Sequence, residues 1–319
     1  MSGGWNTIES DAGVFTYLLT TLGVTDVQFE ELLTLEPSSL APLSPLGVIF
    51  LFKYHVGEKP SSTPHDGSFD YNAIASPGEA NNIWFAAQTI QNACGTQALL
   101  GVLMNKQDSI ELGPTLSEFR DFTSFFDADL KGEALSNSNQ IRDAHNSFAR
   151  SSPFVSDETK MATEDDDLYH FVAYSSINGT LYELDGLQPA PISHGACKDH
   201  EFAEKVVPVL QRRIERYPAH EIRFNLLAMC RDLRIKAREI GDQEWLYREE
   251  EKRRAWRWEN ALRRHNFVGF VGELLKGVVE EKVKKGEYEG WIEEAKGRTN
   301  KKIEEQRKRG KGGDEMDIS

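Results

Sequence analysis

The 319-residue chain is predicted to be an α/β protein, with a mainly antiparallel central sheet flanked by helices and an all-helical C-terminal extension. Three observations support this prediction. The apolar run 46–52 is typical of a buried strand. Two runs rich in aromatic and β-branched residues flank Asn178 and Gly179, which indicates a hairpin. Apolar residues recur at helical spacing in four further segments, which are 12–22, 26–34, 117–129 and 138–149.

The predicted hairpin fixes the position of His170 relative to Asp185. If Asn178 and Gly179 are the whole turn, Ile177 faces Thr180 and the numbers of opposed residues sum to 357. His170 and Asp185 then share a face as diagonal neighbours, about 7–8 Å apart at the backbone. A carboxylate there can hold the imidazole in one tautomer and leave its other nitrogen available for proton transfer. Glu183 points to the same face but is farther from His170, so it is the weaker candidate.

A helix is predicted to begin at Cys94. Asn92 is a candidate N-cap, and the apolar run 99–104 follows the small residues around the cysteine. A thiol at a helix amino terminus meets unpaired N–H groups and the positive end of the helix dipole, which favour the thiolate. Cys94 is therefore a candidate nucleophile.

Gln88 precedes Cys94 by six residues. Its amide, with the Cys94 backbone N–H, is a candidate donor to the oxyanion of a tetrahedral intermediate. Taken singly, a buried cysteine, a surface glutamine and a core histidine are common structural residues. Together with Asp185 they supply each group that a thiol hydrolase requires.

The segments around these residues resemble the active-site blocks of the ubiquitin C-terminal hydrolases, a family of papain-like cysteine peptidases. The resemblance runs from about residue 4 to about residue 228 and rests on Gln88 and on segments 5–11, 13–16, 92–98, 116–119, 169–172 and 181–186. Matched residue by residue, it places the family's nucleophile at Cys94, its base at His170, its orienting acid at Asp185 and its oxyanion glutamine at Gln88.

The resemblance implies a papain-like catalytic domain over 4–230, ubiquitin and ubiquitin conjugates as substrates, and no cofactor. It also implies that segment 151–167, which is polar and without regular periodicity, crosses the active site and limits the size of the group attached to ubiquitin. The alternative is a surface loop with no such effect.

The composition argues against a membrane protein, a secreted protein and a metal-binding protein. No apolar run approaches the roughly 20 residues that span a bilayer, and the N-terminus lacks a signal-peptide pattern, so we expect a cytoplasmic and nuclear protein without membrane association. Cys197 and Cys230 are expected to be reduced core residues. The spacing of His194, Cys197 and His200 offers three metal ligands at most. We therefore predict no metal site there, only polar residues of a surface loop.

The net charge of −14 is unevenly distributed. Residues 1–230 carry a balance of −17 and residues 231–319 a balance of +3. An acidic hydrolase domain argues against nucleic acid as a partner and suits a basic peptide tail as substrate.

The C-terminal part is predicted to comprise a charged helical linker (231–264), a helical partner-docking segment (265–297) and a charged, disordered tail (298–319). Segment 265–297 carries an apolar stripe at helical spacing that requires a cover. It resembles the extension of the longer, proteasome-associated members of the family, which implies docking on a proteasomal ubiquitin receptor. The alternative is a helix that folds back on its own domain.

The expected function is thiol-dependent hydrolysis of amide or isopeptide bonds at the C-terminal glycine of ubiquitin. Two alternatives remain open at this point. One is a proteasome-bound ubiquitin reader with incidental catalysis, and the other is a hydrolase for a ubiquitin-like modifier. Deletion of 231–319 is expected to preserve basal turnover.

Overall fold

The computed structural model describes residues 4–54, 63–79, 81–148, 168–218, 221 and 223–311. They form two compact units, one ending at Arg264 and the other beginning at His265. Segment 151–167, predicted to cross the active site, lies outside the described residues.

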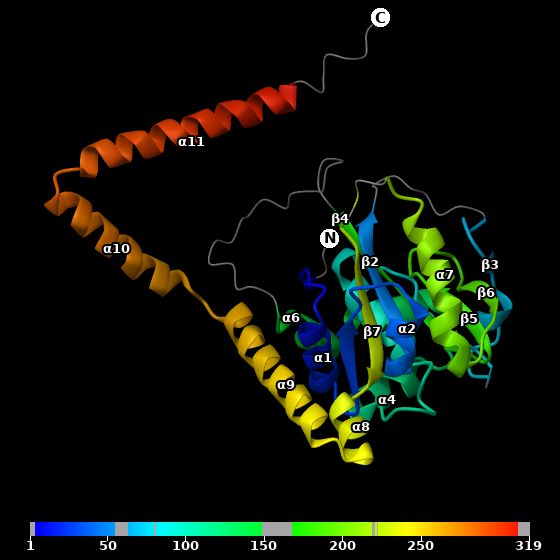
Figure 1. The fold of residues 1–319 in the computed structure, drawn as a ribbon. Coiled ribbons are helices and arrows are strands. Elements are labelled where there is room, and N and C mark those ends of the chain that lie inside the picture. The colour runs from blue at the N-terminus through cyan, green and yellow to red at the C-terminus, as the bar shows by residue number, and fades with distance from the viewer. Residues whose placement is uncertain are drawn as a thin grey trace, which may run out of the picture. The chain divides into compact units, whose positions relative to one another are not determined.

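The first unit is built on a sheet in which all paired strands are antiparallel, as predicted (Figure 1). In space the order is β1-β7-β2-β4-β5-β6-β3. The strands are β1 (Val27–Glu31), β2 (Gly47–Tyr54), β3 (Ser68–Phe69), β4 (Leu168–Ile177), β5 (Thr180–Leu184), β6 (Ile192–Ala196) and β7 (Asn225–Arg231).

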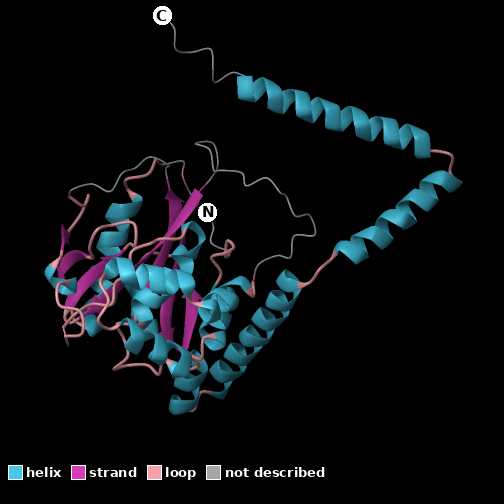
Figure 2. Ribbon diagram, turned by 180° about the vertical axis from the view of Figure 1, so that it is seen from behind, coloured by secondary structure: helices cyan, strands magenta, loops and turns pink. Residues whose placement is uncertain are grey.

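Helices surround this sheet (Figure 2), and its two faces carry separate apolar cores. One core includes buried residues of α1 and α3, and the other is covered by α2 and α7. The α-helices of the first unit are α1 (Ala12–Thr21), α2 (Pro37–Leu40), α3 (Cys94–Leu103), α4 (Gly113–Thr123), α5 (Ala128–Asn137), α6 (Asn139–Asn146), α7 (Phe202–Ile214), α8 (Leu233–Ile240) and α9 (Gln243–Arg264). Short 3-10 helices are η1 (Ala41–Leu43), η2 (Asn72–Ile74), η3 (Gln91–Ala93) and η4 (Asp199–Glu201).

The predicted hairpin is confirmed. Ile177 faces Thr180, and Ala173 faces Leu184, so the opposed numbers sum to 357 along the recorded β4–β5 register. Asn178 and Gly179 both have positive φ, at 50° and 77°, as a type I′ turn requires. The turn residues therefore set which face of β4 carries His170.

Two helix predictions were wrong. Segment 26–34 contains strand β1, because its buried residues pair with β7; apolar spacing over a short segment does not distinguish the two structures. Segment 117–129 is not one helix, because α4 ends at Thr123 and α5 starts at Ala128. Asp127 caps α5 by accepting a hydrogen bond from the Leu130 N–H at 2.8 Å.

Residues 231–264 were predicted to be a charged helical linker. After Arg231, which ends β7, they do form the helices α8 and α9, but these helices belong to the first compact unit. The α9 residue Trp256 packs on α1 so closely that a Cβ added at Gly13 would lie 2.7 Å from Trp256 Cγ. Asn260 Nδ2 donates to the Gly13 carbonyl at 3.1 Å, and Arg253 pairs with Asp232 at 2.9 Å. Deleting 231–319 would remove these contacts. A truncation that removes only the second unit therefore keeps the chain through Arg264.

Replacing Trp256 by alanine is expected to lower the free energy of unfolding by about 2–3 kcal/mol, because the indole fills the space above Gly13. Trp258→Ala is the matched control on the same helix, since that side chain is 67% exposed. We expect it to change the free energy by less than about 0.5 kcal/mol. Urea unfolding measures both values, and equal losses would contradict the packing role of Trp256.

The second unit contains α10 (Val268–Lys284) and α11 (Tyr288–Lys311). In α10, Phe270, Leu274 and Val278 are exposed members of the predicted apolar stripe. The prediction that residues 298–319 are disordered was wrong for residues 298–311, because α11 continues to Lys311. Residues 298–311 are rich in Lys, Arg, Glu and Gln, all good helix formers, and Arg298 pairs with Glu294 across one turn. Residues 312–319 lie outside the described residues.

Candidate active site

Cys94 is the first residue of α3, as predicted, and is 7% exposed. The predicted cap was wrong: Ala93 occupies the N-cap position, and the Asn92 amide donates instead to the Trp5 carbonyl at 3.0 Å. Within the described residues, no side chain caps the first turn of α3. The thiol therefore lies at an amino end where the helix dipole favours an anion.

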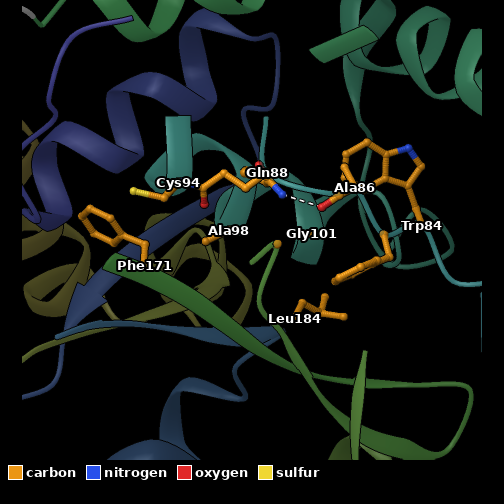
Figure 3. Close-up of a pocket in the computed structure, with 11 residues that line it drawn as sticks. Trp84, Ala86, Gln88, Cys94, Ala98, Gly101, Phe171 and Leu184 are labelled. Atoms are coloured by element: carbon orange, nitrogen blue, oxygen red, sulfur yellow. Dashed lines mark hydrogen bonds between the residues drawn. The ribbon is translucent and has the colours of Figure 1, made fainter. Parts of the chain in front are cut away.

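Gln88 is positioned by the extended segment that precedes Cys94. The Gln88 N–H donates to the Gly186 carbonyl at 2.8 Å, and the Gln97 amide of α3 donates to the Ala86 carbonyl. A Cβ at residue 186 would clash with the Gln97 amide, which would have to leave the Ala86 carbonyl to make room. Gln88, Cys94 and Phe171 line one small pocket, and Cys94 and Phe171 lie at the end away from Trp84 (Figure 3).

His170 and Asp185 are joined as the hairpin geometry predicts. His170 Nε2 lies 2.7 Å from Asp185 Oδ1, and both residues are only 3% exposed. The Leu187 N–H donates to the same carboxylate oxygen at 3.0 Å, and this second hydrogen bond holds the Asp185 carboxylate in place. Cys94 and His170 line the same cleft, and Cys94 contributes to the pKa shift of the imidazole. Because Asp185 occupies Nε2, the ring nitrogen that remains for Cys94 is Nδ1.

The surroundings favour a protonated imidazole. Burial alone would lower the pKa of His170, but the charge and hydrogen bond of Asp185, with a contribution from Cys94, raise it to about 10. Burial alone would raise the pKa of Asp185, but His170, the Leu187 N–H and Arg213 hold it below its usual range. At neutral pH the pair is therefore an imidazolium and a carboxylate.

A cleft of about 600 Å³ opens beside these groups. Cys94, His170, Gln88 and residues 7–10 of the N-terminal segment line it, with Leu51 and Asn225 from β2 and β7. The N-terminal segment is held in place by the Asn92 contact and by His145, whose Nε2 lies 2.6 Å from the Asn6 carbonyl oxygen. An extended peptide therefore has a lined path to the thiol.

The structure brings together all four predicted site residues, since Gln88, Cys94 and His170 line the same cleft and Asp185 binds His170. The family resemblance included segment 5–11 among the active-site blocks but gave its residues no role, and the structure places residues 7–10 on the cleft. The signal that connects them to the site is the Asn92–Trp5 hydrogen bond, which joins residues 87 positions apart. No local pattern contains that information.

Two family models match the chain. The model described as ubiquitin carboxyl-terminal hydrolase, family 1, matches residues 5–215. The chain belongs to this family. A second model, described as ubiquitin carboxyl-terminal hydrolases, matches residues 243–283 and so reaches from α9 into α10.

Relatives cover nearly the whole chain. Ubiquitin carboxyl-terminal hydrolase 2 of Schizosaccharomyces pombe is 50% identical over 300 residues, which is 92% of this chain and 96% of the relative. Ubiquitin carboxyl-terminal hydrolase isozyme L5 of Dictyostelium discoideum is 38% identical and covers 87% of this chain and 92% of its own.

A similar solved structure is Trichinella spiralis UCH37 bound to ubiquitin vinyl methyl ester. It has a TM-score of 0.60 and 32% identity, and the match covers 82% of this chain and 99% of that one. These similarities establish the predicted family, its fold and an enzyme of the cysteine-type ubiquitinyl hydrolase class.

Proposed function

We propose that this hydrolase cleaves amide or isopeptide bonds at the C-terminal glycine of ubiquitin, with Cys94 as nucleophile and His170 as base and proton donor. Asp185 orients the imidazole, and Gln88 stabilises the oxyanion. The observation that carries this proposal is the His170–Asp185 hydrogen bond beside a cleft that Cys94, His170 and Gln88 line together. The reaction needs no cofactor.

Before substrate is attacked, the Cys94 proton already resides on His170, which is the imidazolium that Asp185 stabilises. The Cys94 thiolate then attacks the glycine carbonyl carbon. Negative charge moves to the carbonyl oxygen, where the Gln88 amide and the Cys94 N–H donate hydrogen bonds. Collapse of the intermediate breaks the carbon–nitrogen bond, and the imidazolium protonates the departing amine. His170 then takes a proton from water, which attacks the thioester to release the ubiquitin carboxylate and restore the thiol.

Replacing Gln88 by alanine is expected to lower kcat by about 100- to 1000-fold, the usual cost of one oxyanion donor. KM should change much less, because the charge on oxygen develops only after substrate has bound. Gln188→Ala is the control, since this glutamine contacts Asp185 at 3.4 Å outside the proposed oxyanion site. Steady-state kinetics on a ubiquitin C-terminal amide distinguishes the variants. An equal fall in kcat for Gln88→Ala and Gln188→Ala would show that Gln88 does not stabilise the oxyanion.

Ubiquitin is the proposed substrate because relatives over the whole chain carry its name and a similar structure is bound to a ubiquitin ester. The acidic balance of residues 1–230 and the position of Glu9 on the cleft suit a basic peptide tail. The test compares turnover of fluorescent C-terminal amides of ubiquitin and of a ubiquitin-like modifier. Preference for ubiquitin is expected, and preference for the other modifier would contradict the assignment.

Segment 265–297 is the proposed docking element for a proteasomal ubiquitin receptor, in a protein of the cytoplasm and nucleus. Support comes from the exposed stripe on α10, which includes Phe270 and Leu274, and from the family model that matches residues 243–283. A chain ending at Arg264 should keep basal turnover and lose stimulation by the receptor. Retained stimulation would place the docking site in the first compact unit.

A further inference from the structure

A second buried carboxylate lies next to the proposed catalytic pair. Glu183 is two residues before Asp185 and is also 3% exposed. Its Oε2 lies 3.3 Å from His194 Nε2, and its Oε1 lies 3.6 Å from Arg213 Nη1. His194 is itself buried, with a side chain 2% exposed, so the prediction that it is a surface loop residue was wrong.

Arg213 comes from α7 and contacts both Glu183 and Phe52. Its guanidinium carbon lies 4.7 Å from the centre of the Phe52 ring. Phe52 in turn contacts the His170 ring edge to face, at 5.6 Å between ring centres, and is its cross-strand partner in β2. Arg213 also interacts through its charge with Asp185 and Glu183. Arg213 is therefore a cation that contacts Glu183 and Phe52 and acts on Asp185 through its charge.

The charges around Arg213 explain why a cation is required. Burial alone would raise the pKa of both carboxylates, and each is held low partly by Arg213. Two buried carboxylates that repel each other tend to retain one proton between them when no cation offsets them. A proton on Asp185 would remove the negative charge that stabilises the imidazolium bound at His170 Nε2. The titratable and charged groups that face this region are Cys94 of α3, His170 and Tyr174 of β4, Glu183, His194 of β6, Asp66, and Arg212, Arg213, Arg216 and Tyr217 of α7 and its C-terminal end.

We propose that Arg213 is a positioning residue for the His170–Asp185 pair: it offsets the charge of Glu183 and so keeps Asp185 a carboxylate. The inference rests on the proposed roles of His170 and Asp185. Arg213 acts through these two side chains and through Phe52, at the face of the sheet opposite the core that contains Cys94.

The test is the pH dependence of kcat/KM on a ubiquitin C-terminal amide. Arg213→Met removes the charge and keeps an apolar stem against Phe52. We expect the acid limb to move to higher pH by about one unit, so that turnover below the limb falls about tenfold. Arg212→Met is the matched control, because this neighbour is 50% exposed and pairs with Asp66. Its acid limb should coincide with that of the wild type.

A second substitution tests the reason for the shift. Adding Glu183→Gln to Arg213→Met removes the repelling carboxylate, so the acid limb should return toward its wild-type position. If Arg213→Met does not fold, Arg213→Gln removes the same charge while keeping a donor to Glu183. An unmoved limb in a folded charge-removing variant, or no return in the double variant, would overturn the inference. An inactive wild type would instead count against the proposed function.

Discussion

Replacing Cys94 by alanine is expected to abolish turnover of ubiquitin C-terminal amides, with a loss of about 10⁵- to 10⁶-fold in kcat. The Cys94 thiol at the start of α3 lines the cleft with His170 and forms the proposed acyl intermediate, which alanine cannot form. Affinity for free ubiquitin should persist, because the other residues that line the cleft are unchanged. Single-turnover kinetics and a binding titration separate the two effects.

Cys197→Ala is the matched control for this substitution. Cys197 is a buried, free cysteine in the other core of the sheet, so the same atom is removed away from the site. A small loss of stability with full turnover is expected. Turnover by Cys94→Ala close to that of the wild type would exclude the proposed nucleophile.

Replacing Asp185 by asparagine is expected to lower kcat by about 100- to 10,000-fold. Asparagine has nearly the same shape, but it cannot offset the charge of an imidazolium. Asp185 raises the pKa of His170 to about 10, so the amide should lower that pKa. The ring is protonated below its pKa, and the alkaline limb of the pH profile should therefore move to lower pH. NMR titration of the His170 ring measures the same change directly.

The control for Asp185→Asn is Asp70→Asn, the same substitution at a carboxylate that binds Tyr182 at 2.8 Å. We expect a wild-type pH profile from this variant. An alkaline limb that stays in place in Asp185→Asn would show that the carboxylate does not control the proton on His170.

The site residues were predictable because their signals are local. An Asn-Gly turn fixes the β4–β5 register, and small residues before an apolar run mark the start of α3. The family resemblance agreed with both. Contacts between distant parts of the chain were not predictable in this way. The β1 segment is a strand because β7 lies beside it, and Asn92 binds Trp5 in place of capping its own helix.

The same reason explains why the boundary of the catalytic unit and the role of Arg213 were missed. The unit extends to Arg264 because Trp256 of α9 packs over Gly13, a contact that joins residues more than 240 positions apart. Glu183 was placed on the correct face of the hairpin, yet its partners His194 and Arg213 come from β6 and α7. Hairpin geometry contains no information about those elements.

The most direct test of the proposed mechanism is covalent capture of the nucleophile by ubiquitin vinyl methyl ester, followed by peptide mapping with mass spectrometry. Wild type, Cys94→Ala and Cys197→Ala are treated in parallel. We predict one adduct, on Cys94, in the wild type and in Cys197→Ala, and none in Cys94→Ala. An adduct on another residue, or capture by Cys94→Ala equal to that of the wild type, would contradict the proposed mechanism.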